Sequence, residues 1–162
     1  MKSKLLKLAV TAALVISACM TSAAQDVDGI SLWDKYTKAQ LVQKYGQPVE
    51  YRSQEGDNEE DGLTEYITFK DIDFHLEGNQ VVDYDIKTDK PRALTKTIKG
   101  GIGIGDDASV LNPIKDKLFS TKTLKDGVTE YSYWLDRDIE RWIYVDVKGN
   151  KIVYIWTYTR LL

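Results

Sequence analysis

The chain has 162 residues, of which 43% are hydrophobic, 29% are charged and 10% are aromatic, and its formal net charge is −3. This composition predicts a folded protein of one or two small domains and excludes a disordered or low-complexity chain. The slight excess of acids argues against a nucleic-acid partner, and a single cysteine excludes both a disulfide scaffold and a cysteine-based zinc cluster.

The first residues have the pattern of a secretory signal peptide. Three lysines precede an apolar stretch from residue 8 to residue 20, and small residues follow it. We expect residues 1–24 to be the leader, with cleavage after Ala24. The alternative is a bacterial lipobox, in which residues 1–18 are removed and Cys19 is acylated. The stretch is shorter than the roughly 20 apolar residues of a spanning helix, so membrane contact is expected only through an anchor on Cys19.

Two short motifs occur twice in the chain, in the same order. Residues 61–66 read DGLTEY and residues 126–131 read DGVTEY, while GNQVV at 78–82 recurs as GNKIV at 149–153. Self-similarity of this kind is the signature of a duplicated structural unit. We therefore expect two tandem units, at residues 30–90 and 95–162.

The first unit combines one helix with three strands. Thr37 and Gln40 form a capping box that predicts the start of a short helix, and Gly46 ends it. After an acidic loop, strand-like runs cover residues 63–70, 73–77 and 80–87. A three-residue turn, Glu77–Asn79, is expected to join the last two strands.

A basic, glycine-rich segment at residues 87–105 separates the units. Its glycine spacing matches neither GxGxxG nor GxxxxGK[ST], which excludes a phosphate-binding loop. We interpret it as a flexible turn into the second helix beside a solvated basic linker.

The second unit repeats the plan of the first. Asp107 is placed to cap a short helix, which Pro113 interrupts, and strands are expected at residues 128–135, 140–147 and 151–159. Together the patterns predict an α+β fold of two tandem units. In each unit short helices precede an antiparallel β-meander, and the helices pack on one face of the sheet.

A local motif resembles a known family. Residues 37–48 read TKAQLVQKYGQP, which resembles the helix and turn of the SmpA/OmlA small lipoproteins of the outer-membrane β-barrel assembly machinery. Residues 104–111 resemble the start of the same motif. These lipoproteins are similar in fold to the β-lactamase inhibitor proteins, whose two tandem helix-plus-sheet units present a concave sheet face to a partner protein. The resemblance implies that fold and a protein-binding role.

Strand alternation gathers aromatic side chains on one face of the second sheet. A three-residue turn at Lys148–Asn150 places Ile143 with Val153 and Ile155 on an aliphatic, helix-covered side. The helix-free side then carries five aromatic residues and, in the first unit, two aspartates: Trp142, Tyr144, Tyr154, Trp156, Tyr158, Asp83 and Asp85.

Two interpretations of this face stay open. An exposed aromatic cluster beside acids is typical of a binding surface. Alternatively, the aromatic residues are cross-strand pairs that hold the sheet together, covered by residues 50–61 or by a second copy of the chain.

The usual constellations of catalytic and metal-binding residues are missing from the sequence. His75 alternates with Asp73 on the polar side of its strand and is interpreted as a surface or edge-strand histidine. The acidic run at 57–62 has Thr68 where a calcium loop needs glutamate. We expect no enzyme activity, no catalytic residue, no metal site and no cofactor.

The sequence therefore predicts an exported, non-enzymatic protein that is periplasmic, outer-membrane-associated or secreted. It is expected to be a protein-binding module or an envelope accessory protein that uses its helix-free sheet face. The expected partner is another envelope or extracellular protein with basic or apolar side chains. The alternative is a carbohydrate-binding module, in which a glycan stacks on the aromatic rings and hydrogen-bonds to the aspartates.

Overall fold

The computed structural model describes residues 26–55 and 62–160. The predicted leader, Cys19 and both cleavage sites lie outside this range. A two-stranded ribbon, β1 (Asp26–Val27) and β2 (Ile30–Ser31), precedes the main sheet. The strands of that sheet are β3 (Glu50–Glu55), β4 (Leu63–Thr68), β5 (Ile72–Glu77), β6 (Gln80–Ile86), β7 (Leu118–Thr123), β8 (Val128–Asp136), β9 (Arg141–Lys148) and β10 (Lys151–Thr159).

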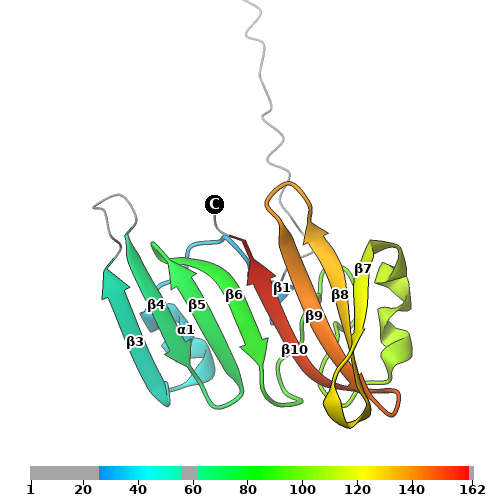
Figure 1. Cartoon of the computed structure of the whole chain (residues 1–162). Helices are drawn as coiled ribbons and strands as arrows, with labels where there is room; N and C mark the ends of the chain where they lie inside the picture. Colours follow the sequence, from blue (N-terminus) through cyan, green and yellow to red (C-terminus); the bar gives the residue numbers. More distant parts are fainter. Residues whose placement is uncertain (1–25, 56–61, 161–162) are drawn as a thin grey trace, which may run out of the picture.

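Within the described residues, these strands form one continuous antiparallel sheet in the order β3-β4-β5-β6-β10-β9-β8-β7 (Figure 1). The predicted α+β fold of two helix-plus-meander units is therefore wrong, because the structure is mostly β. The strand β6 pairs with β10, so strands from both halves of the chain share a single sheet. The repeated motifs show only that the two halves have similar local structure. They do not show that β6 and β10 pair, which leaves neither strand with an open edge in the middle of the molecule.

The helix α1 (Lys38–Tyr45) begins and ends where the sequence predicts. The Thr37 hydroxyl accepts a hydrogen bond from the Gln40 backbone N–H at 3.3 Å, and the Gln40 side-chain oxygen accepts one from the Thr37 N–H at 2.8 Å. Gly46 ends the helix with a φ of 84°. Leu41 is the buried residue of α1 and attaches the helix to the sheet.

The second predicted helix is a 3₁₀ helix, η1 (Ala108–Lys117). Asp107 caps it as expected, because its side chain accepts a hydrogen bond from the Ser109 N–H at 2.9 Å. Pro113 lies inside η1 and does not interrupt it. A further single 3₁₀ turn, η2 (Lys125–Gly127), precedes β8.

The expectation of a solvated linker within residues 87–105 is wrong, because several apolar residues of this segment are buried. Ala93, Leu94 and Ile102 are buried in it, and Ala93 forms isolated bridges to both Val27 and Ile102. Arg92 is held by an ion pair with Asp106 at 2.7 Å. Apolar residues scattered among lysines gave no periodic signal, yet they cover the helix side of the sheet.

Both hairpin turns that contain the GN motif are one residue shorter than predicted. The turns contain Gly78–Asn79 and Gly149–Asn150, all at positive φ, and each is followed by a β-bulge. The bulge residues are Val82 and Val153, and Val153 is 39% exposed instead of buried with Ile155 as expected. Because a bulge adds one residue, the strands beyond it regain the predicted faces.

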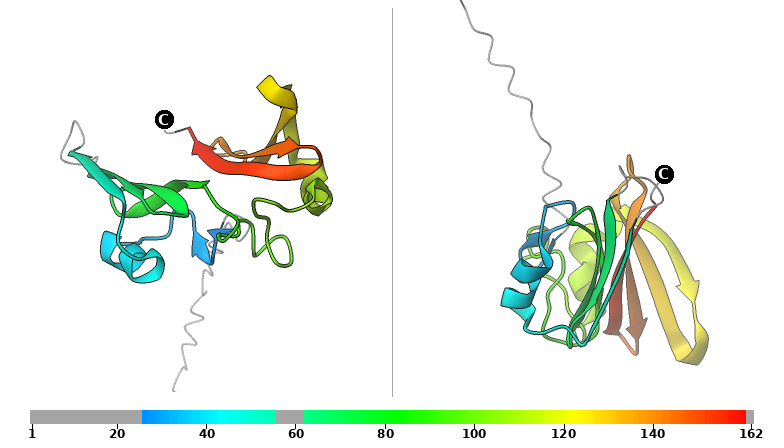
Figure 2. Two further views of the ribbon diagram at one scale, coloured as in Figure 1. Left: turned by 90° about the horizontal axis from the view of Figure 1, so that it is seen from below. Right: turned by 90° about the vertical axis from the view of Figure 1, so that its left-hand side faces the viewer.

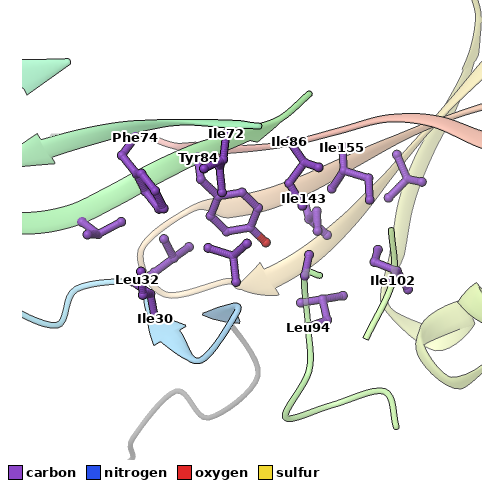
Figure 3. Close-up of a cluster of buried hydrophobic side chains, with 14 of the residues drawn as sticks. Ile30, Leu32, Ile72, Phe74, Tyr84, Ile86, Leu94, Ile102, Ile143 and Ile155 are labelled. Atoms are coloured by element: carbon purple, nitrogen blue, oxygen red, sulfur yellow. The ribbon is translucent and has the colours of Figure 1, made fainter. Parts of the chain in front are cut away.

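The hydrophobic core lies on one side of the sheet only. Ile30 and Leu32 face Phe74 and Tyr84 in one part of it (Figure 3). Leu94 and Ile102 cover the β9 and β10 side chains in the other part. The sheet curves away from this layer, so its helix-free face is the inner side of the curve (Figure 2).

Candidate functional site

The helix-free face carries all five predicted aromatic residues, as strand alternation indicates. Tyr144 stacks on Trp156 with ring centroids 4.1 Å apart, and Trp142 stacks on Tyr158 at 5.9 Å. Tyr158 is 45% exposed, and the other four, Tyr154 included, are partly exposed. Each cross-strand aromatic pair contributes about 0.5–1.5 kcal/mol beyond its buried area, so these rings also stabilise the sheet.

Two further aromatic residues extend this row to the sheet edge and were missed in the sequence. Trp134 lies 4.7 Å from Trp142, and Phe119 lies 4.8 Å from Trp134. Phe119 is 55% exposed. Alternation with buried Tyr133 could have placed Trp134 on this face, but Phe119 sits at an irregularity of β7, where alternation fails. We call Phe119, Trp134, Trp142 and Tyr158 the aromatic row.

The two predicted aspartates lie on the same face, beside the aromatic residues. Asp85 pairs across the strands with Trp156, and Asp83 pairs with His75 on β5. Asp73, the neighbour of Asp85 on β5, is a third acid of this group that strand alternation in the second unit does not indicate. All seven predicted residues thus lie on one face, across β6, β9 and β10.

A hollow of about 290 Å³ opens between β4, β5, β6 and β10. We call it the seam hollow. Its lining combines acids, aromatic rings and one arginine, namely Asp73, Asp83, Asp85, Tyr66, His75, Trp156 and Arg52.

The hollow lies where the pairing between β6 and β10 stops. Only Ile155 with Ile86 and Trp156 with Asp85 form ladder pairs between these strands. Beyond them, the Thr157 hydroxyl accepts a hydrogen bond from the Tyr84 backbone N–H at 2.9 Å. Because a side chain takes the place of the backbone partner, the strands are held further apart there.

The carboxyl group of Asp85 is the most perturbed acid of the hollow. Burial, followed by the charges of Asp73 and Asp83, raises the pKa of Asp85 to about 6. The Tyr154 hydroxyl donates a hydrogen bond to Asp85 and opposes part of this shift. Burial and the Asp85 charge raise the pKa of Tyr154 to about 12, so Tyr154 remains a donor at neutral pH.

Asp83 is held in place from both halves of the sheet. The Thr159 hydroxyl donates to Asp83 at 3.1 Å and itself accepts from the Arg141 Nε at 3.0 Å. Arg141 is fully buried, and its guanidinium lies 5.0 Å from the Trp33 ring centroid. Burial lowers the pKa of Arg141 to about 10, which leaves it charged at neutral pH.

His75 lies on the same face as Asp73, as predicted, but it is not an edge-strand residue, because β5 lies inside the sheet. Its ring stacks on Tyr66 with centroids 4.6 Å apart and planes 10° apart. The Nε2 atom lies 3.4 Å from Glu77, and the Nδ1 atom lies 3.8 Å from Asp83. His75 thus forms one wall of the seam hollow.

A second acidic pair lies on β8 and β9. Glu130 and Asp146 are direct cross-strand neighbours, which brings two like charges together. Burial, with Glu130 second, raises the pKa of Asp146. The helix-free face is therefore acidic on both sides of Tyr154.

Comparisons with protein-family models, curated proteins and solved structures find no match to this chain. The resemblance to the SmpA/OmlA lipoproteins stays a prediction. Across residues 26–55 and 62–160, no group of three or more His, Cys, Asp and Glu side chains is arranged to hold a metal ion. In the same part of the chain, no helix has the length and apolar character needed to cross a bilayer.

Proposed function

We propose that this chain is an exported, non-enzymatic protein that binds another envelope or extracellular protein on its helix-free sheet face. One observation carries the proposal. The aromatic row ends in Phe119 and Tyr158, which are 55% and 45% exposed. Large rings that serve only as core are normally buried, whereas exposed aromatic patches are typical of interfaces.

The surroundings of the row favour a protein as partner. Acidic side chains adjoin the rings on β5, β6 and β9, so a surface with basic and apolar groups is complementary to this face. Stacking between the rings does not compete with this role, because pre-stacked side chains lose little conformational freedom on binding.

Site-specific cross-linking tests the proposal. We replace Tyr158 or Phe119 with a photo-reactive phenylalanine in cells of the native host, and we use Tyr51 as the matched control. Tyr51 is 37% exposed but lies on the opposite face, where the Lys38 ammonium sits over its ring. We expect one discrete protein adduct from positions 158 and 119 and none from position 51.

Two results would contradict the proposal. Adducts of equal yield from all three positions would show that contact is random. A glycan that binds the purified protein, and loses affinity on Tyr158→Ala, would instead favour the carbohydrate-binding alternative.

Export and anchoring rest on the leader sequence alone. If Cys19 is acylated, metabolic labelling with an alkyne fatty acid marks the protein, and Cys19→Ala abolishes the label. Labelling that persists in the variant, or secretion of unlabelled protein starting at Gln25, would contradict the anchor.

A further inference from the structure

The seam hollow is large enough to hold one whole side chain. Its volume of about 290 Å³ lies at the lower limit of the roughly 300–1,000 Å³ of small-molecule pockets. A chain of sugars would need a longer groove. The hollow therefore suits one compact group that a partner surface inserts between β5 and β10.

Three carboxylates, Asp73, Asp83 and Asp85, line the hollow against one cation, Arg52, which is itself paired with Glu50. Lys87 forms an ion pair with Asp73 at 2.6 Å, and Asp83 receives the hydrogen bond from Thr159. In the described part of the chain, Asp85 takes part in no ion pair, although it is largely buried. A buried carboxylate is stable when a cation pairs with it, so the hollow favours a positively charged group.

Flat aromatic rings form the walls of the hollow. Trp156 stacks on Tyr144 on its β9 side and lines the hollow on its β6 side. Across the hollow, Tyr66 stacks on His75, and the Arg52 guanidinium lies 5.7 Å from the Tyr66 ring centroid. A ring of this wall thus already accepts a guanidinium from within the chain. Such ring faces attract cations, and planar guanidinium groups stack on them better than ammonium groups.

We infer that the seam hollow is a socket for the guanidinium group of an arginine side chain presented by the partner protein. This inference rests on the proposed function, because the arginine belongs to the partner. Asp83 and Asp85 are two residues apart on β6, so both carboxylates face the hollow and suit the forked donors of a guanidinium. Trp156 covers the flat side of the group.

A titration of the isolated protein with small probes tests the socket. The probes are Nα-acetyl-arginine amide, its lysine counterpart and its citrulline counterpart, which has the shape of arginine without the charge. NMR follows the Trp156 indole, the Tyr66 ring and the Asp85 carboxyl. We expect saturable shifts with the arginine probe at millimolar concentration, and at least tenfold weaker binding of the citrulline probe. The arginine probe should also lower the pKa of Asp85 from about 6.

Matched variants locate the binding. Asp85→Asn should weaken arginine-probe binding at least tenfold, whereas Asp116→Asn, an exposed acid on η1, should leave it unchanged. The circular dichroism of both variants should match that of the parent protein. Such a match shows that the loss of binding is not caused by unfolding.

Three results would overturn the socket. These are equal shifts with the citrulline probe, unchanged binding in Asp85→Asn, and no shift at all. Equal binding of the lysine probe would overturn the choice of guanidinium. The cross-linking of Tyr158 is a separate measurement, so a protein adduct without probe binding would reject the socket while leaving the proposed function intact. Probe binding without an adduct would reject the proposed function.

Discussion

Asp85 illustrates how a single buried side chain shapes this face. The groups around it are Asp73 and Lys87, which lie on β5 and just after β6, Asp83 on its own strand and Tyr154 on β10. Two like charges outweigh the one lysine, and burial removes much of the water that would screen them. The carboxylate is consequently costly to the folded protein when it is ionised.

This cost predicts a pH-dependent effect of Asp85→Asn. The folded pKa of about 6 exceeds the ordinary aspartate pKa of 3.8, so the folded protein binds the proton more tightly than the unfolded chain. The contribution of Asp85 to stability therefore rises as the pH falls from 7 towards 4. At pH 7.5 the variant should be more stable by up to about 3 kcal/mol, and near pH 3.5 the difference should disappear.

Urea unfolding at the two pH values measures this effect, with Asp116→Asn as the control. The control should show no gain at either pH, because Asp116 is exposed. A variant that is less stable than the parent at pH 7.5 would show that ionised Asp85 is favourable, which contradicts the expectation.

Among the elements, β6 and β10 form the shortest ladder of the sheet. It contains two ladder pairs, whereas β8 and β9 are paired from Val128 with Lys148 to Asp136 with Arg141. Two threonine hydroxyls of β10 extend the contact with β6. The Thr157 hydroxyl accepts a hydrogen bond from the Tyr84 N–H, and the Thr159 hydroxyl lies 3.3 Å from the Val82 carbonyl oxygen. These hydroxyls keep the two halves together while leaving space for the hollow.

Thr157→Val should therefore destabilise the protein by about 1–3 kcal/mol, because the buried Tyr84 N–H loses its acceptor. Thr121→Val, the same change at an exposed position of β7, should alter stability by less than about 0.5 kcal/mol. Urea midpoints measure both effects, and Thr157→Ser should restore most of the loss. Equal effects at positions 157 and 121 would argue against the hydroxyl as a replacement for a ladder bond.

Several elements show which signals the sequence carries. The capping box of α1 and the GN turns were visible because they depend on residues adjacent in the chain. The edge strands β3 and β7 were missed because every one of their residues is exposed, which leaves no alternation to detect. The bulges at Val82 and Val153 were missed because a bulge depends on how a strand pairs with its neighbour, which the local sequence does not show.

At the scale of the whole molecule, a continuous core joins the two halves of the chain. Ile86 and Ile155 are fully buried partners across the seam, and Leu94 and Ile102 of the connecting segment pack into the same cluster. We therefore expect both halves to unfold together, even though the sequence repeats.

Two spectroscopic probes check this cooperativity. Three of the four tryptophans, Trp134, Trp142 and Trp156, lie in the second half, so fluorescence reports mainly on that half. Far-ultraviolet circular dichroism reports on both halves. The two urea transitions should coincide, and Ile86→Ala should shift both to lower urea by the same amount. Separate transitions would show that the predicted units at 30–90 and 95–162 fold independently.

The sequence by itself determined the α1 helix, six of the strands of the main sheet, and the face on which Trp142, Tyr144, Tyr154, Trp156, Tyr158, Asp83 and Asp85 lie. These features follow from local spacing, because side chains alternate along each strand. Only the tertiary structure decided that one sheet unites both halves, that Phe119 and Trp134 extend the aromatic row, and that a hollow opens at the seam. Those features depend on which strands pair, and pairing between distant strands is set by burial of the common core.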